Sequence, residues 1–346
     1  MKHLFQNILQ FALMALLSLG ALPAAHAQSS GLGLDSSLNL LSFGNFLVPS
    51  SDVQGRVAVA GNASIANYSI NTVNGTQSLY AGTALTVGGN LQYGSGGIFG
   101  NTVVGGNLST GLGASFIGGV EIGGNLNTNG NWLSATSISY AGSATGLQQW
   151  QDPVPTQVAA SSVQLGINFS AEQQRLSSLS QSFDNLANTG TGVNPWGGTV
   201  MFDAQGANLA VFDLAAGDAA KNLRLDNLGA NSTVILNVHG QTIDFGQHGY
   251  ENFVTGHVLF NLPEATQVTF ASGVNASFLA PLANFLTPIG GLITGQVVVG
   301  NWSGMGQVND GAFTGTISPV PEPETYALML SGLALMFFVT RRRRSH

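Results

Sequence analysis

Three histidines could supply metal ligands, because they recur at a regular spacing close to two carboxylates. His239, His248 and His257 lie nine residues apart, and Asp244 and Glu251 lie between them. Imidazole and carboxylate groups are common ligands of zinc and related metals. However, the spacing matches no helical metal motif such as His-Glu-x-x-His. We therefore interpret the three residues as histidines of exposed loops.

A second set of residues that could do chemistry is acidic. These residues are Asp203, Asp213, Asp218 and Asp226. Carboxylates and turn carbonyls are the ligands that calcium prefers, so calcium is the ion that this stretch would suit, although it contains no EF-hand pattern. The alternative, which we favour, is a solvated acidic face that includes Lys221 and Arg224.

The composition limits the classes of function. Charged residues make up 7% of the 346 residues, and there are 47 glycines and no cysteine; about 25% charged residues is typical of soluble domains. Between Gln28 and Val320, four basic residues stand against fourteen carboxylates, which gives a net charge of −10. This balance excludes a nucleic-acid binder, which needs a basic face. The lack of cysteine excludes disulfides, thiolate catalysis and zinc–thiolate sites.

A glycine-rich hexapeptide recurs in the first half of the chain. Its copies are residues 86–91, 103–108 and 121–126, whose asparagines Asn90, Asn107 and Asn125 are 17 and 18 residues apart, and degenerate copies lie at 59–62 and 298–302. Self-similarity at a fixed period predicts a solenoid. No Gly-Lys-Ser/Thr follows any copy, so these glycines are not expected to hold phosphate.

The period also predicts the shape of one coil. About 18 residues at roughly 3.3 Å each give a perimeter of about 59 Å, which suits three strands of five to six residues. Gly-Gly-Asn suits a corner, because glycine supplies positive φ and asparagine tolerates it. The apolar residues on either side of the triplet are then expected to point inward and stack. Histidines nine residues apart would fall on different sides of such a coil.

One helix is expected on this solenoid, over residues 170–188. Ser170 and Gln173 have the spacing of a capping box, and Leu176, Leu179, Phe183 and Leu186 form one apolar stripe that would lie flat on the strands. Strands are expected to resume after it. The β-rich runs are residues 233–238, 257–262, 267–270, 276–281 and 295–300.

Both ends of the chain carry targeting signals. Residues 1–27 read as a signal peptide with an apolar run from Ile8 to Leu22 and cleavage between Ala27 and Gln28. Near the C-terminus, Pro321, Glu322 and Pro323 precede an uncharged stretch at 325–340, which is expected to form a membrane-spanning helix. Four arginines then follow: Arg341, Arg342, Arg343 and Arg344. Arginines bias their side toward the cytoplasm, so the body is expected outside the cytoplasmic membrane.

This arrangement resembles the PEP-CTERM sorting signal of Gram-negative bacteria. That signal consists of Pro-Glu-Pro, one hydrophobic span and a terminal basic cluster, in the order found here. The resemblance implies processing by an exosortase and an association with exopolysaccharide production. The domain organisation expected is therefore a signal peptide at 1–27, a body at 28–317 and a sorting signal at 318–346.

The body itself resembles the choice-of-anchor A family, an adhesive domain that carries different C-terminal anchors in different bacteria. The residues that carry the resemblance are 43–46, 51–62, 234–240, 260–266, 278–283 and 293–297. The resemblance covers most of residues 35–315. It implies a right-handed β-solenoid and a surface adhesive role, with no known catalytic residues.

Two rival functions remain for a β-solenoid. A polysaccharide lyase or hydrolase would need paired carboxylates in a cleft or a cationic site, and the only internal basic residues are Arg56, Arg175, Lys221 and Arg224. An ice-binding protein would need a flat row of threonines, whereas Thr83, Thr86, Thr102 and Thr110 do not recur at one position of the coil. We therefore expect no enzymatic activity and no catalytic, cofactor-binding or metal-ligating residues, with calcium as the one ion that would fit.

The expected function follows from these points. The chain is predicted to be an exported adhesin-like protein of the cell surface or extracellular matrix, held for a time in the cytoplasmic membrane. Its processing partners would be signal peptidase and exosortase, and its ligand an extracellular polysaccharide or a surface protein.

Overall fold

Short parallel strands separated by turns are the main elements of the protein. The computed structural model describes residues 31–72 and 82–317. Residues Ser30–Gly315 form one compact unit; the second unit groups the chain ends, of which only Thr316 and Ile317 are described. The predicted signal peptide, with Ala27 and Gln28, therefore lies outside the described residues, as does the sorting signal from Pro321 to Arg344.

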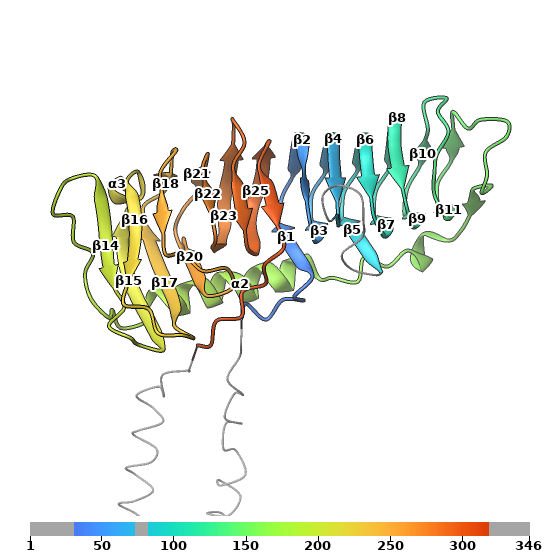
Figure 1. The fold of residues 1–346 in the computed structure, drawn as a ribbon. Helices are drawn as coiled ribbons and strands as arrows, with labels where there is room; N and C mark the ends of the chain where they lie inside the picture. Colours follow the sequence, from blue (N-terminus) through green and yellow to red (C-terminus); the bar gives the residue numbers. More distant parts are fainter. Residues whose placement is uncertain (1–30, 73–81, 318–346) are drawn as a thin grey trace, which may run out of the picture. The chain divides into compact units, whose positions relative to one another are not determined.

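The first half of the compact unit winds as a series of stacked coils (Figure 1). Its strands are β1 (Leu38–Ser42), β2 (Phe46–Val53), β3 (Arg56–Val59), β4 (Ala63–Ile70), β5 (Thr83–Val87), β6 (Leu91–Ile98), β7 (Asn101–Val104), β8 (Leu108–Phe116), β9 (Gly119–Ile122), β10 (Leu126–Asn127), β11 (Ser137–Tyr140), β12 (Ala144–Thr145) and β13 (Thr156–Gln157). Strands two apart in the sequence pair in parallel, as one coil stacks on the next.

The second half begins with helices and returns to strands. It contains η1 (Ala160–Ser162), α2 (Phe169–Asp184), β14 (Thr199–Asp203), β15 (Leu209–Ala215), α3 (Ala216–Ala219), β16 (Asn222–Asp226), β17 (Thr233–His239), β18 (Thr242–Asp244), β19 (Tyr250–Glu251), β20 (Val258–Asn261), β21 (Gln267–Thr269), β22 (Gly273–Val274), β23 (Ser277–Thr287), β24 (Leu292–Thr294), β25 (Val297–Gly304) and β26 (Gln307–Asn309).

The two halves join through strands that are far apart in the sequence. β1 pairs with β3 on one side and with β25 on the other, so that Leu40 lies opposite both Val57 and Val297. The chain therefore starts inside the stack, runs outward to β13, returns past the start along α2 and winds back from β15 to β25 (Figure 1). The β-solenoid is confirmed, whereas this discontinuous order of the coils was not predicted.

Each full coil has three sides, as the period predicted. The side on which α2 lies is here called the helix face. It contains β15, β17, β20, the start of β23, the start of β25, and then β1, β3, β5, β7, β9, β11 and β13. The second face contains β18, β21, the ends of β23 and β25, the starts of β2, β4, β6 and β8, and then β10 and β12. The third face contains β22, β24, β26 and the ends of β2, β4, β6 and β8.

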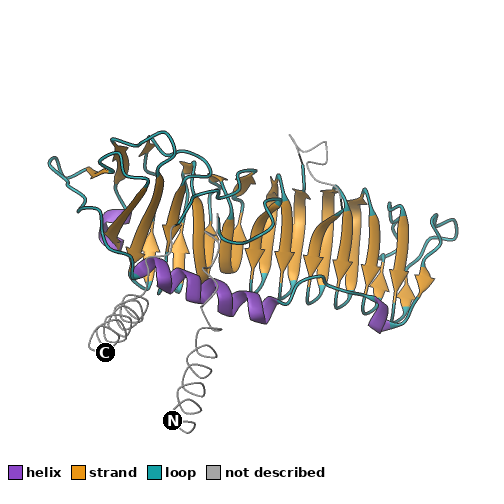
Figure 2. Ribbon diagram, turned by 90° about the horizontal axis from the view of Figure 1, so that it is seen from below, coloured by secondary structure: helices purple, strands orange, loops and turns teal. Residues whose placement is uncertain are grey.

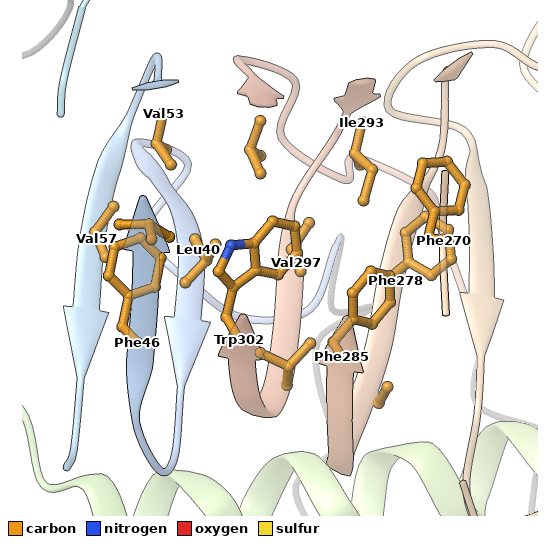
Figure 3. Packing of buried hydrophobic residues seen from close by; sticks show 14 of the residues in the cluster. Leu40, Phe46, Val53, Val57, Phe270, Phe278, Phe285, Ile293, Val297 and Trp302 are labelled. Atoms are coloured by element: carbon orange, nitrogen blue, oxygen red, sulfur yellow. The ribbon is translucent and has the colours of Figure 1, made fainter. Parts of the chain in front are cut away.

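Inward side chains of the three faces form one continuous apolar core. At the junction of the two halves, the Trp302 and Phe285 rings stack with their centroids 5.2 Å apart and their planes 8° apart (Figure 3). On the other side of Trp302, Phe46 lies opposite it in the register and packs edge-on against Tyr68 at 5.8 Å. Because a buried aromatic side chain contributes a large apolar area, these rings hold the junction together.

The predicted helix is present, with different ends. α2 spans Phe169–Asp184, and its N-cap is Asn168, whose side chain accepts a hydrogen bond from the Ala171 backbone N–H. Ser170 is therefore inside the first turn rather than the cap, since the amide of Asn168 already satisfies that N–H. Leu176 and Phe183 are buried against the helix face, along which α2 runs (Figure 2).

Candidate binding face

A ladder of asparagine side chains sets the corner between the helix face and the second face. The side-chain Oδ1 atoms of Asn301, Asn45, Asn62, Asn90, Asn107 and Asn125 accept hydrogen bonds from the backbone N–H of Asn45, Asn62, Asn90, Asn107, Asn125 and Ser143, respectively, at 2.6–3.0 Å. Asn90, Asn107 and Asn125 thus occupy equivalent positions of successive coils, as the repeat predicted. The ladder also crosses the junction of the two halves, from Asn301 to Asn45.

The glycines of the Gly-Gly-Asn triplet are required for a reason other than the one predicted. Neither Gly105 nor Gly106 has a positive φ, and Asn107 does not have one either. A side chain on Gly106 would instead place its Cβ 2.6 Å from Oδ1 of Asn90, and one on Gly105 would collide with the carbonyl oxygen of Gly88. The predicted reason, glycine for a left-handed turn, is therefore wrong: glycine is required because the neighbouring coil comes too close for a Cβ.

The apolar residues on either side of the triplet point inward, as predicted. Val87, Val104 and Ile122 lie opposite one another in the register and are fully buried. The residues after the triplet, Leu91 and Leu108, are buried in the same way. The corner therefore fixes the register of the strand that follows it, and with it the direction of every side chain on the second face.

The second face presents one continuous row of outward side chains, which we call the outward row. Its members occupy equivalent positions of ten successive strands: Asp244, Thr269, Leu286, Ser303, Leu47, Ser64, Gln92, Ser109, Asn127 and Thr145. Neighbouring strands lie about 4.8 Å apart, so nine steps span roughly 43 Å. Only Asp244, at one end, carries a charge.

The outward row can bind by area rather than at one point. Hydroxyl and amide groups both donate and accept hydrogen bonds, and rigid parallel pairing holds them at a constant spacing. Small residues such as Ala66, Gly94 and Gly111 lie alongside the row, whereas Leu47 within the row and Leu112 beside it are exposed apolar side chains. The arrangement suits an extended polymer, whereas acid–base chemistry would require titratable groups that the row offers only at Asp244.

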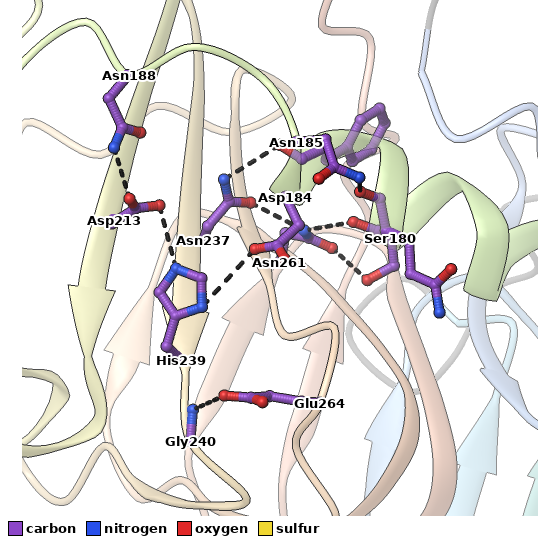
Figure 4. Close-up of polar contacts among 12 residues, drawn as sticks. Ser180, Asp184, Asn185, Asn188, Asp213, Asn237, His239, Gly240, Asn261 and Glu264 are labelled. Atoms are coloured by element: carbon purple, nitrogen blue, oxygen red, sulfur yellow. Dashed lines mark hydrogen bonds and ion pairs between the residues drawn. The ribbon is translucent and has the colours of Figure 1, made fainter.

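The structure separates the three histidines that the sequence singled out. His239 ends β17, where its ring nitrogens lie 3.1 Å from Asp213 and 3.7 Å from Asp184 of α2 (Figure 4). His248 precedes β19 and His257 precedes β20. His248 and His257 lie in loops, as interpreted. His239 does not, because it is the last residue of strand β17, although 40% of its side chain is exposed.

Asp213 is held ionised at this position. Burial works against its charge, but hydrogen bonds from Asn188 at 2.5 Å and from His239 outweigh that effect and lower the pKa of the carboxyl. Beneath it lies a buried network that the sequence analysis missed. Asn261 accepts from the Ser180 hydroxyl at 2.6 Å and donates to Asn237 at 2.9 Å (Figure 4). Only the interruption of two apolar strands by asparagine could have signalled this network.

The acidic residues do not converge. Asp218 pairs with Lys221 at 2.6 Å, and Asp226 pairs with Arg224 at 2.7 Å, as expected for a solvated face. The pKa of Asp203 is lowered by a hydrogen bond from the Asn227 side chain. Within residues 31–72 and 82–317, no three His, Asp or Glu side chains lie close enough together to hold a metal ion.

A groove of about 420 Å³ lies between the helix face and the segment before α2. Arg56 and Asp35 line it and form an ion pair at 3.4 Å, and Glu172 and Gln164 lie on its other side. The hydroxyl of Ser37, followed by its backbone N–H, lowers the pKa of Asp35. Since a general acid needs a raised pKa, Asp35 is unsuited to that role. Asp52 of β2 is different, because burial raises its pKa despite a hydrogen bond from Thr72.

The positions of the threonines agree with the sequence analysis. Thr86 lies opposite Val103, Thr102 opposite Leu85, and Thr110 opposite Tyr93. These threonines therefore do not form one row. Among the helices that the structure describes, none has the length and apolar character required to cross a bilayer; the predicted span at 325–340 lies outside them.

Comparisons with known proteins were made on the whole chain. Residues 31–310 match the family described as "Putative Ice-binding-like adhesive domain", and residues 319–344 match the PEP-CTERM protein-sorting motif. A solved structure, an ice-binding protein from an Antarctic bacterium of the Flavobacteriaceae, is 12% identical. It covers 77% of this chain and 80% of its own, with a TM-score of 0.30. The comparison with curated proteins found no match.

Proposed function

Because the chain belongs to the ice-binding-like adhesive domain family and ends in a PEP-CTERM sorting motif, it is an exported surface protein, and we propose that it adheres through its second face. The observation that carries the proposal is the outward row, in which seven of the ten residues carry a hydroxyl or amide group and which runs across both halves of the solenoid. The ligand that suits it is a polysaccharide or a surface protein of the extracellular matrix, bound without turnover.

The charge of the body narrows the choice of ligand. With a net charge of −10 between Gln28 and Val320, the body repels strongly acidic polymers at long range. A calcium ion bridging two acidic partners would relieve that repulsion, but the acids Asp203, Asp213, Asp218 and Asp226 do not meet in one site. We therefore propose adhesion that needs no cofactor.

The test measures retention of purified residues 28–317 on extracellular matrix, with calcium and with a chelator. We use the body alone because it forms a compact unit with its own core. Replacing Ser64 and Ser109 by arginine places two bulky cations in the outward row and should reduce retention. Replacing Ser178 and Ser182, which are exposed on α2, by arginine adds the same charge and is the matched control. Equal retention of all three proteins would exclude the second face.

An extracellular polysaccharide-active enzyme, a lyase or hydrolase, is the alternative function. The observation that would favour it is Asp52, whose raised pKa is the property of a general acid. Release of oligosaccharides from the matrix by the body, abolished in Asp52→Asn, would replace the adhesive function by this one. Ice is not proposed as a ligand, because the described threonines do not form a row.

Export and anchoring follow from the sorting motif, and their finer steps are part of the proposal. We propose that signal peptidase cleaves between Ala27 and Gln28 and that the 325–340 segment then holds the chain in the cytoplasmic membrane. An exosortase next cleaves close to Pro321, Glu322 and Pro323. The body is thereby transferred to the cell surface or the extracellular matrix.

A further inference from the structure

Two exposed tryptophans lie in the loops that follow β10 and β12, at the end of the solenoid where the first half stops. The side chain of Trp132 is 47% exposed and that of Trp150 is 75% exposed. Large aromatic side chains exposed on a soluble surface commonly mark a binding site. Of the other two tryptophans, Trp302 is buried in the core and Trp196 is exposed in a loop of the second half.

The loops that carry these two indoles are clamped to each other. The Gln151 side chain accepts a hydrogen bond from the backbone N–H of Leu133 at 3.0 Å and donates one to its carbonyl oxygen at 2.8 Å. The Gly130 backbone N–H also donates a hydrogen bond to the carbonyl oxygen of Gly146 at 3.0 Å. The loops are thus held in the same stacking that joins the coils of the solenoid.

The clamp also fixes the relation between the two indoles. Trp132 and Trp150 are 18 residues apart, which is the offset that separates Leu133 from Gln151. They therefore occupy equivalent positions of adjacent coils, which stack about 4.8 Å apart. Leu133 and Gln151 are buried, whereas the residue before each of them is exposed. Each exposed indole is therefore adjacent in sequence to one member of the buried Leu133–Gln151 pair, which holds the two loops together.

The neighbours of the indoles in the sequence are mostly polar, although Leu147 and Val154 are exposed as well and Asp152, two residues after Trp150, is an exposed carboxylate. The sequence has no charged residue between Glu121 and Asp152. Amide side chains occur throughout the two loops, at Asn127, Asn129, Asn131, Gln148 and Gln149. The many amides around the two indoles favour a ligand rich in hydroxyl groups, with which amides exchange hydrogen bonds in both directions.

We propose that Trp132 and Trp150 form a stacking site for the neutral pyranose rings of a polysaccharide. The C–H groups on one face of a pyranose pack against an indole, and the amides pair with the ring hydroxyls. This inference rests on the proposed adhesive function and names a ligand class and a second contact point. A chain bound there would meet the domain at one end of the outward row, whose last members are Asn127 and Thr145.

The test is a titration of tryptophan fluorescence in residues 28–317 with three neutral oligosaccharides: cellohexaose, chitohexaose and maltohexaose. We expect a saturable change with at least one of them below about 10 mM, which is weak binding of a few kcal/mol. Trp150→Ala and Trp132→Ala should each weaken binding by about tenfold. Trp150→Phe, which keeps an aromatic face, should retain most of it.

Trp196→Ala is the matched control, since it removes a tryptophan that is 78% exposed but lies in the other half. It should leave the dissociation constant unchanged, and all four variants should keep the unfolding temperature of the parent. No saturable change with any of the three sugars would overturn the inference. Self-association that Trp150→Ala abolishes, measured by sedimentation without sugar binding, would also overturn it in favour of a second copy as the occupant. Matrix retention that survives both tryptophan variants would leave the adhesive function standing and remove this site.

Discussion

The Oδ1 atom of Asn301 accepts a hydrogen bond of 2.6 Å from the backbone N–H of Asn45, a residue 256 positions earlier in the chain. The same bond joins Asn90 to Asn107 within one half of the solenoid, at 2.8 Å. The asparagine ladder therefore makes the same hydrogen bond at the junction of the two halves as it does between two successive coils within one half. Its continuity is what allows the outward row to cross from Ser303 to Leu47 without a break in register.

Removing one member of the ladder should destabilise the domain measurably. In Asn107→Ala, the backbone N–H of Asn125 loses its acceptor, and we expect the free energy of unfolding in urea to fall by about 0.5–1.5 kcal/mol. Gln92→Ala is the control, because Gln92 is an exposed amide of the outward row. Equal losses in the two variants would show that the ladder adds nothing beyond an exposed amide.

A side chain at the corner glycine should cost more than the lost amide. Gly106→Ala places a Cβ 2.6 Å from Oδ1 of Asn90, so the coils must move apart, and overpacking of this kind costs about 1–3 kcal/mol. Gly198→Ala meets no atom within 4 Å and should change the unfolding free energy little. The prediction fails if Gly106→Ala unfolds at the same urea concentration as the parent.

The aromatic stack should couple the two halves. Trp302→Ala removes the ring that packs on Phe285 at 5.2 Å, and we expect a loss of about 3–5 kcal/mol. Calorimetry of the parent should show a single unfolding transition for residues 28–317, because the core is continuous across the junction. Trp302→Phe, which keeps a ring at this position, should recover part of the loss. Two separate transitions in the parent would contradict the coupling.

Stability should depend on pH through Asp213. Folding lowers the pKa of this carboxyl below its ordinary value of 3.8. Such a group stabilises the fold above its unfolded pKa, and the contribution is lost as the pH falls through the folded pKa. Asp213→Asn should therefore lower the unfolding temperature at pH 7, and the difference from the parent should shrink toward pH 3. Glu121→Gln, at an exposed position of β9, is the control; a difference that stays constant with pH would refute the prediction.

Processing of the tail should depend on the arginines as well as on Pro-Glu-Pro. Replacing Arg341, Arg342, Arg343 and Arg344 by alanine removes the charges that resist translocation, so the tail should slip through the membrane and cleavage should decrease. Replacement by lysine keeps the charge and should preserve cleavage. Mass spectrometry of the surface-exposed protein measures the outcome. Intact arginines on the surface-exposed parent protein would rule out processing.

The local features of this fold could be predicted from the sequence, because they repeat. The spacing of Asn90, Asn107 and Asn125 indicated equivalent corners, and the apolar stripe around Leu176 indicated a helix lying on the strands. The pairing of Leu40 with Val297 could not be predicted, since no short-range pattern signals which strands meet across 257 residues. The role of glycine was also misjudged, because the distance between coils is a tertiary property.

For the candidate sites too, features that follow the sequence repeat could be predicted and features that depend on tertiary structure could not. Trp132 and Trp150 are also separated by the period of 18 residues, but they lie outside the glycine-rich repeats from which that period is recognised. The pairing of His239 with Asp213 joins the ends of two neighbouring strands, β15 and β17, in a coil of irregular length. Because this coil carries no sequence repeat, its length could not be predicted, and the position of His239 in a strand could not be predicted either.

The position of β1 inside the stack also dictates an order of assembly. One side of β1 can pair with β3 as soon as residue 59 is available, but its other side waits for Val297, Val298 and Val299 of β25. Until those residues arrive, β1 is an open edge strand, which is a template for aggregation. In a chain that is exported from its N-terminus onward, this edge closes only when almost the whole body has left the translocation channel. The fold can therefore be completed only at the end of secretion.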